Sequence, residues 1–225
     1  QEIFALFLNQ HQLSFAELEK LMQIRSNKLA YHLACMKSEG VLSKKEKKYQ
    51  LSEKGERYLP LYSHIIGKQI SPLPVVLVAV LQRKNILLIK RKKRPYKNYW
   101  SMIGGRILLG ETVQTASQRL VREKTGFQNV CITTRAVLHE IVRGNEGPKY
   151  SFILFFTKTI VKEVALKQTP AGELAWFPLN KLPEHLIHSD KWLLKNKIKS
   201  RISVTNATMI EEEGKLSSFE ILNNI

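Results

Sequence analysis

The chain has 225 residues, 44% of them hydrophobic, and a net charge of +17, so it is long enough for one or two domains with real cores and its charge indicates anionic partners. It holds no apolar run long enough to span a bilayer and no visible signal peptide, and its two cysteines, Cys35 and Cys131, lie far apart. We therefore expect a cytoplasmic protein with no membrane partner, no disulfide and no thiolate metal site.

The N-terminal third alternates short apolar segments with helix signals. A short helix is expected over residues 2–9, and the Ser14–Glu17 capping-box pattern opens a second helix that continues through Met22. A third helix follows, with Ser26 as its predicted N-cap and Gly40 just beyond its end.

A basic hairpin is expected next. Short strands over residues 41–42 and 49–51 enclose Ser43–Lys48, a turn rich in lysine. Ser52 is the predicted cap of a last helix over residues 53–65.

This order of elements resembles the winged helix-turn-helix of bacterial and archaeal repressors, and the segment Leu51–Gly55 after the hairpin strengthens the likeness. The resemblance implies that the third helix enters the DNA major groove, while the hairpin lysines meet phosphates, which supply affinity without sequence choice. The alternative is a small domain for protein contacts with a solvated lysine loop. The candidate DNA-binding residues are Asn27, Lys28, Tyr31 and His32 on the outer face of the third helix and Lys44, Lys45, Lys47 and Lys48 on the hairpin.

A stiff, proline-containing linker is expected at residues 69–74, ahead of a long apolar run. Beyond it, the patterns predict a β-hairpin from residues 75–81 and 86–90, strands over 130–138, 150–157 and 174–177, and a helix around Trp192. A mixed sheet with at least one packed helix is the expected result.

Residues 104–127 hold the most informative motif. Gly104-Gly105 predicts a tight turn that a ligand can approach closely, and Gly110 precedes a helix over residues 112–124 that Gly126 closes. Because a helix N-terminus favours anions, a glycine loop before such a helix predicts a phosphate site.

The spacing of this motif resembles the Nudix box, to which it contributes Gly105, Glu111, Arg119, Glu123 and Gly126. Trp100 with Ile103-Gly104-Gly105, and the later segment 173–179, extend the likeness to roughly residues 72–200. The resemblance implies a Nudix α/β/α sandwich with a mixed sheet. The fold class expected for the whole chain is α+β, with the winged helix domain first.

Two metal-binding positions of the box are changed. The resemblance places three carboxylates around Mg²⁺, but Leu120 and Lys124 stand at two of these positions and leave Glu123 alone. Mg²⁺ is usually held by one or two carboxylates plus phosphate oxygens, and an ammonium about 4 Å from even a monovalent cation costs about 4 kcal/mol at a surface-like dielectric. We therefore expect only a weak metal site at Glu123. Mg²⁺ is expected as a cofactor only if the protein is hydrolytic, with Glu123 as its catalytic carboxylate and a base from another loop, such as Glu146.

Lys124 has two interpretations. It is either a helix-end lysine that interacts with the helix dipole, or a replacement for the metal's charge that holds a diphosphate without activating water. Glu111 and Arg119 are interpreted mainly as structural residues that fix the loop against the helix. The candidate ligand-binding residues are Gly104, Gly105, Arg106, Glu111, Arg119, Glu123 and Lys124.

The positive charge is concentrated in the second domain, because residues 71–200 carry 23 Lys+Arg against 8 acids. Arg83–Lys97 alone carries eight basic residues and no acid, with Tyr96 and Tyr99 at its end. This segment is a candidate nucleic-acid track, a funnel for a nucleotide, or a solubilising loop.

Three functions fit these observations. The first is a homodimeric, DNA-binding transcriptional regulator whose Nudix domain senses a nucleotide or nucleotide-sugar diphosphate, a role that the two resemblances together imply. The second is an active Nudix hydrolase with a nonstandard metal site, and the third is a non-catalytic nucleic-acid or protein-binding scaffold. The predicted domains are the winged helix at 1–68, the linker at 69–74, the Nudix-like domain at 75–200, and a tail at 201–225 that forms a hairpin, an exchanged dimer arm or a disordered end.

Overall fold

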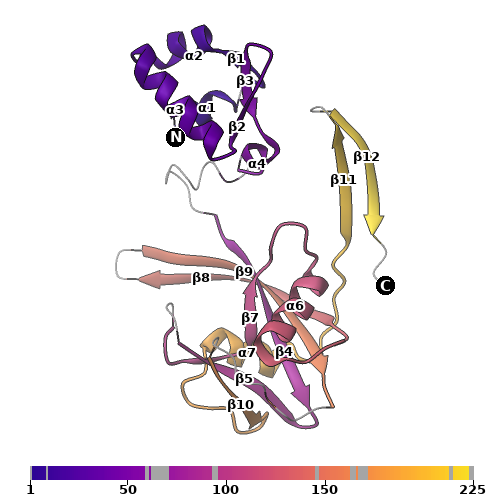
Figure 1. Ribbon diagram of the computed structural model, residues 1–225. Coiled ribbons are helices and arrows are strands. Elements are labelled where there is room, and N and C mark those ends of the chain that lie inside the picture. The colour runs from indigo at the N-terminus through magenta and orange to yellow at the C-terminus, as the bar shows by residue number, and fades with distance from the viewer. Residues whose placement is uncertain are drawn as a thin grey trace. The chain divides into compact units, whose positions relative to one another are not determined.

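The computed structural model describes residues 2–8, 10–58, 61, 71–92, 96–144, 147–162, 166, 172–212 and 215–222 (Figure 1). The chain divides into two compact units, Gln1–Ser71 and Pro72–Ile225. The first strand of the second unit begins at Leu73, so part of the segment expected as a linker is extended sheet.

The N-terminal unit joins small helices to a three-stranded antiparallel sheet of order β1-β3-β2. Its elements are α1 (Glu2–Leu6), β1 (Leu13–Ser14), α2 (Phe15–Met22), α3 (Ser26–Ser38), β2 (Leu42–Lys45), β3 (Lys48–Leu51) and α4 (Glu53–Glu56). Leu18 on α2 and Leu29 and Leu33 on α3 are fully buried in one apolar cluster that also takes in α1 and the sheet. Met36, predicted to complete the stripe of α3, packs on this cluster but is only half-buried.

The capping signals of this unit are confirmed in part. Ser14 and Glu17 form the predicted capping box, and Gly40 follows α3 with a left-handed φ of +73°, which glycine adopts without strain. The prediction for Ser26 is wrong, because Arg25 is the N-cap of α3. Ser26 lies inside the first turn, where its hydroxyl donates to Glu19 and so ties α3 to α2. The helix predicted over residues 53–65 spans only Glu53–Glu56, and most of its remainder lies outside the described residues.

The second unit is built on a mixed sheet, as predicted. Its order is β10-β5-β4-β9-β8, with β6 paired to β5 and β7 paired to β4, and the pairing of β4 with β9 is parallel while the others are antiparallel. The strands are β4 (Leu73–Gln82), β5 (Asn85–Arg91), β6 (Trp100–Ser101), β7 (Ile103–Arg106), β8 (Thr133–Gly144), β9 (Gly147–Ile160) and β10 (Gly172–Pro178).

Both faces of this sheet are covered because β4 is apolar on both sides. Val76, Val78 and Val80 pack with α6 (Val113–Thr125) in one cluster, while Leu77, Ala79 and Leu81 pack with α7 (His188–Asn196) in the other. Successive side chains of a strand point to opposite faces, so a continuous apolar run requires a layer on each side. The helices therefore lie on opposite faces of the sheet.

The glycine pair at 104–105 does not form the predicted tight turn. Both residues lie in β7, where Gly104 pairs with Leu77 and Gly105 with Val76. A Cβ on Gly104 would lie 2.7 Å from the carbonyl oxygen of Val76, so this strand needs glycine for close packing rather than for a bend.

The C-terminal segment contains an antiparallel pair, β11 (Asn206–Glu212) and β12 (Lys215–Leu222). The described residues of this tail therefore form an antiparallel pair, as the hairpin alternative predicted. Among the helices that the structure describes, none is long and apolar enough to cross a membrane.

Candidate functional site

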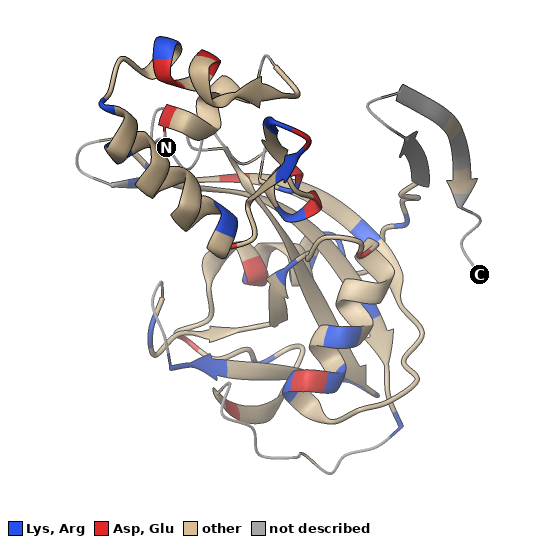
Figure 2. Cartoon of the chain, turned by 45° about the horizontal axis from the view of Figure 1, so that its top comes forward, with Lys and Arg blue, Asp and Glu red and all other residues tan. Residues whose placement is uncertain are grey.

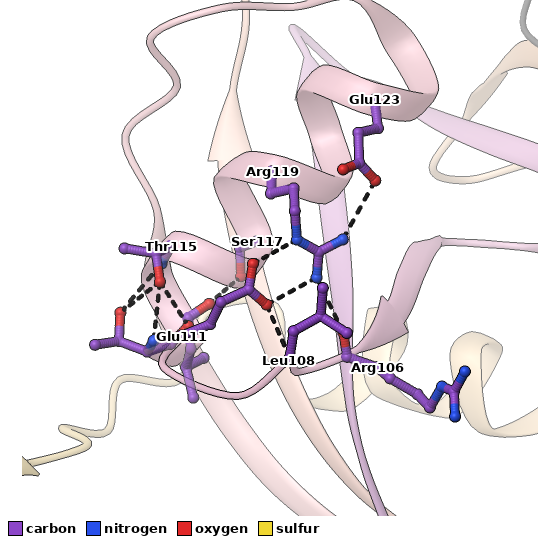
Figure 3. A network of polar contacts seen from close by, with 9 residues as sticks. Arg106, Leu108, Glu111, Thr115, Ser117, Arg119 and Glu123 are labelled. Carbon is purple, nitrogen blue, oxygen red and sulfur yellow. Dashed lines mark hydrogen bonds and ion pairs between the residues drawn. The ribbon is translucent and has the colours of Figure 1, made fainter. Parts of the chain in front are cut away.

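Arg119 clamps the loop between β7 and α6 onto the helix. Its guanidinium pairs with both carboxylate oxygens of Glu111, the Nη2–Oε2 distance being 2.8 Å, and it also donates to the carbonyl of Arg106 at 3.1 Å (Figure 3). The second Glu111 oxygen accepts from the backbone N–H of Leu108 at 2.9 Å. Arginine beside it lowers the pKa of Glu111. The predicted structural role of this pair is therefore confirmed.

Glu123, the carboxylate that remains of the three, also faces the clamp. Its Oε2 accepts from Nη1 of Arg119 at 3.2 Å, and its side chain is half exposed (Figure 3). Both signs of charge lie along α6 (Figure 2). A metal at Glu123 would lie beside the guanidinium of Arg119, which already pairs with one of the two carboxylate oxygens.

Leu120 is part of the core rather than of a polar site. It is 4% exposed and belongs to the cluster under α6. Its Cδ2 lies 2.6 Å from where a Cβ on Gly105 would stand, so its methyl group fills the space that glycine leaves open. An apolar side chain therefore occupies the position where the Nudix box has a carboxylate.

We expect Gly105→Ala to destabilise the second unit, because the added methyl group meets Leu120. Overpacking of this kind typically costs about 1–3 kcal/mol in the free energy of unfolding, which denaturant titration measures. The cost should shrink in a Leu120→Ala background, where the space is open. An equal cost in both backgrounds would contradict the proposed contact.

Lys124 reaches the backbone of β7. Its Nζ donates to the carbonyl oxygen of Gly104, and burial, followed by the nearby charge of Arg91, lowers the pKa of its ammonium. The ammonium therefore lies beside the glycine pair, and Lys124 lines a cleft together with these glycines.

This cleft has a volume of about 510 Å³. It is lined by Val75, Leu77, Arg91, Tyr96, Ser101, Met102, Gly104, Gly105, Arg106, Lys124, Glu140, Phe152, Leu154, Ile187, Ser189 and Asp190. Of the candidate ligand residues, Gly104, Gly105, Arg106 and Lys124 meet here, whereas Glu111, Arg119 and Glu123 form the clamp and do not line the cleft. Arg106 belongs to both the clamp and the cleft lining. Its carbonyl oxygen accepts from Arg119 in the clamp, while its guanidinium points away from the clamp (Figure 3).

The phosphate site expected at the N-terminus of α6 is not where the cleft lies. Thr112 and Thr115 form a reciprocal capping box that satisfies N–H groups of the first turn, and the cleft is lined from α6 by Lys124, in the last turn. The part of the chain between β7 and the end of α6 that lines this cleft is a basic side chain and β7 rather than a helix N-terminus.

Arg91 and Tyr96 of this cleft belong to the basic segment that was a candidate funnel for a nucleotide, whereas Ser101, Glu140, Ser189 and Asp190 were not predicted. Asp190 is the most unusual, because it is 2% exposed and burial raises the pKa of its carboxyl to about 7. Its Oδ2 accepts from the backbone N–H of Met102 at 2.6 Å. In the sequence it is an ordinary acid in the first turn of a helix, and no pattern distinguishes it.

The residues present do not fit a magnesium site of the Nudix type. Within the described residues, no group of three or more His, Cys, Asp or Glu side chains could hold a metal ion. Glu123 is paired with Arg119, and Leu120 and Lys124 offer no carboxylate oxygen. Glu146, the candidate base, lies outside the part of the chain that the structure describes.

The candidate DNA-binding residues lie on the N-terminal unit. Asn27, Lys28 and Tyr31 are exposed on α3, and His32 is half-buried in edge contact with the ring of Tyr31. The four lysines at 44, 45, 47 and 48 are exposed on the β2–β3 hairpin, where Lys44 lies 5.1 Å from the ring centre of Tyr49.

The mixed sheet between two helix layers, with a Glu–Arg clamp before and along α6, is the architecture that the resemblance to the Nudix box implied. Residues 71–196, more than half of the chain, match the NUDIX domain, and the chain belongs to this family.

Comparison with known proteins gives relatives within the same region. An ADP-ribose pyrophosphatase of Methanocaldococcus jannaschii is 33% identical over 120 residues, covering 52% of this chain and 70% of that protein. An 8-oxo-dGDP phosphatase of Homo sapiens is 29% identical over 112 residues, covering 50% of this chain and 34% of that protein. Among solved structures, a MutT NUDIX hydrolase from Burkholderia pseudomallei has a TM-score of 0.50 and 25% identity, covering 56% of this chain and 98% of that one.

Proposed function

We propose that this protein is a DNA-binding transcriptional regulator whose Nudix domain binds a nucleotide or nucleotide-sugar diphosphate without hydrolysing it. The observation that supports this proposal most directly is the set of contacts that three residues of α6 make at the former metal-binding positions. Leu120 is buried against Gly105, Lys124 is bonded to Gly104, and Glu123 is paired with Arg119. With these contacts α6 still packs as the family fold requires, but it no longer presents the carboxylate oxygens that would bind a metal.

Lys124 replaces the metal as the cation that meets the diphosphate. It shares the cleft with Arg106 and Arg91, so three basic side chains face a ligand there. Cationic side chains stabilise phosphate oxygens by charge-assisted hydrogen bonds, but they do not lower the pKa of a bound water as a metal does. If Lys124 takes the place of the metal, the diphosphate is bound but its hydrolysis is not catalysed. The name of the archaeal relative, an ADP-ribose pyrophosphatase, supports a nucleoside diphosphate as the ligand class.

The N-terminal unit is the DNA-reading part of the proposal. Its α2–turn–α3 arrangement, followed by a hairpin with four exposed lysines, has the parts of a winged helix. The exposed Asn27 and Lys28, at the start of α3, have the hydrogen-bond donors that read base edges. Winged helix proteins often bind paired half-sites, and we therefore propose a homodimer whose arrangement the ligand biases.

Replacing Lys44, Lys45, Lys47 and Lys48 by alanine should weaken DNA binding by at least tenfold at moderate salt. It should also flatten the dependence of affinity on salt, since each phosphate contact contributes a slope of about 0.9 in log–log units. Fluorescence anisotropy with a labelled promoter fragment at several salt concentrations measures both effects. Exposed Lys195 on α7 supplies a control substitution, Lys195→Ala, that should leave the slope unchanged. An unchanged slope in the quadruple variant would contradict a DNA-contacting hairpin.

A thermal-shift screen and a hydrolysis assay on one panel of dinucleotides and nucleotide sugars test the proposal as a whole. The screen is run without metal, and the assay with Mg²⁺ or Mn²⁺. We expect stabilising ligands that remain intact. The second candidate function is an active Nudix hydrolase, which the identity of 33% to a pyrophosphatase favours. Metal-dependent turnover that Glu123→Gln abolishes would establish this second function and overturn the first.

A further inference from the structure

The cleft has chemically different sides. Arg106 lies on β7 and pairs with Val75 on β4, Val75 pairs with Leu154 on β9, and β9 in turn pairs with β8, where Glu140 lies. Three strand spacings of about 4.8 Å separate the basic strand from the acidic one, or about 14 Å. A ligand whose phosphates meet Arg106 and Lys124 therefore has room to extend across two strands toward Glu140.

The floor between these residues is apolar. Val75 and Leu77 on β4 and Phe152 and Leu154 on β9 all line the cleft, because alternate residues of neighbouring strands share one face. Such a floor suits a flat or methylated group rather than a second phosphate.

Asp190, on α7, is the second carboxylate of the cleft, and it lies beside Met102, the residue before β7. Asp190 is 2% exposed and lines the cleft from α7, and its one hydrogen bond with the described residues is the contact of Oδ2 with Met102. Its second oxygen is thus available to a ligand. The negative charge of Glu140 adds to the increase in the pKa of the Asp190 carboxyl and of the Tyr96 phenol, for both of which burial is the larger cause. Arg91 also faces Asp190 and offsets part of the negative charge of the two carboxylates.

We propose that the ligand is a nucleoside diphosphate whose second substituent carries a fixed positive charge, bound between Glu140 and Asp190. This proposal rests on the proposed function, which places the diphosphate at Arg106 and Lys124. The charges of Glu140 and Asp190 repel one another, Asp190 also loses solvation, and a cation bound between them relieves both costs. The rings of Tyr96 and Phe152, which line the same cleft, add surfaces that attract a soft cation such as a pyridinium or a quaternary ammonium.

Two pairs of probes that differ in one positive charge test this inference. The first pair is the oxidised and reduced nicotinamide adenine dinucleotides, and the second is cytidine diphosphate choline and its 3,3-dimethylbutyl analogue, in which carbon replaces nitrogen. Affinities are measured by calorimetric titration without metal at pH 8, with ADP-ribose as a ligand that lacks a fixed charge. We expect the charged member of at least one pair to bind about tenfold more tightly than the neutral one.

Glu140→Gln should reduce that preference, taken as the ratio of the two affinities within a pair, to threefold or less, with Asp190→Asn giving the same direction. Glu173→Gln, which removes an exposed carboxylate on β10 outside the cleft, should keep the preference. If neither pair shows a preference, or the preference survives Glu140→Gln, the cation site is wrong while the proposed function stands. If no diphosphate binds, ADP-ribose included, the proposed function itself fails.

Discussion

Lys124→Glu is expected to lower the metal-free affinity for ADP-ribose by at least a hundredfold. The substitution replaces an ammonium beside Gly104 by a carboxylate in a cleft where phosphates are proposed to bind. One charge pair about 4 Å apart is worth about 4 kcal/mol at an effective dielectric of 20, and each 1.4 kcal/mol changes affinity about tenfold. Calorimetric titration of both proteins without metal measures the loss directly.

Lys195→Glu is the matched control for this variant. Lys195 also lies in the last turn of a helix, α7, so reversing its charge reproduces the loss of any favourable interaction with a helix dipole. It does not line the cleft. If Lys124→Glu binds ADP-ribose as well as Lys195→Glu does, Lys124 is a helix-end lysine and not a substitute for a metal.

Asp190→Asn is expected to stabilise the protein at pH 8 and to change the pH dependence of its stability. The carboxyl has a pKa of about 7 in the folded protein against an ordinary value of 3.8, so between these values the folded state holds a proton that the unfolded chain has lost. The free energy of unfolding of the native protein therefore falls as pH rises from about 4 to about 7 and levels off above that. The full difference corresponds to about 4 kcal/mol at most, since one pKa unit is worth about 1.4 kcal/mol.

Asparagine keeps an oxygen that can accept from Met102 and carries no charge, so the variant should gain stability at pH 8 and lose that gain toward pH 4. Urea titrations at several pH values give the difference between the two proteins. Glu173→Gln, on an exposed strand position, should follow the native curve. A native protein that is more stable than Asp190→Asn at pH 8 would show that Asp190 is ionised and well paired there.

Local signals predicted the frame of the site from sequence because its parts are close together in the chain. Glu111, Arg119 and Gly126 lie within one loop and one helix, so their spacing determines which side chains meet. The same holds for the capping box at Ser14 and for the apolar run of β4, whose two-sided burial follows from its composition.

The two carboxylates of the cleft could not be predicted in this way. Asp190 meets Met102 across 88 residues of sequence, and Glu140 enters from a strand whose outward and inward faces depend on a bulge in the β8–β9 pairing. The misplaced turn at Gly104 has a related cause. Glycine is used there to let β7 pack against β4, and a sequence does not distinguish a glycine that bends from one that admits a neighbour.

The fate of bound ADP-ribose tests the central claim most directly. The protein is mixed in excess with ADP-ribose and Mg²⁺, held for many minutes, and the nucleotides are then released with acid and separated by chromatography. We predict that ADP-ribose shifts the melting temperature, and that it is recovered intact with no AMP above the protein-free control. Formation of AMP at a rate that Glu123→Gln abolishes would contradict the account and make this protein a Nudix hydrolase with a rebuilt metal site.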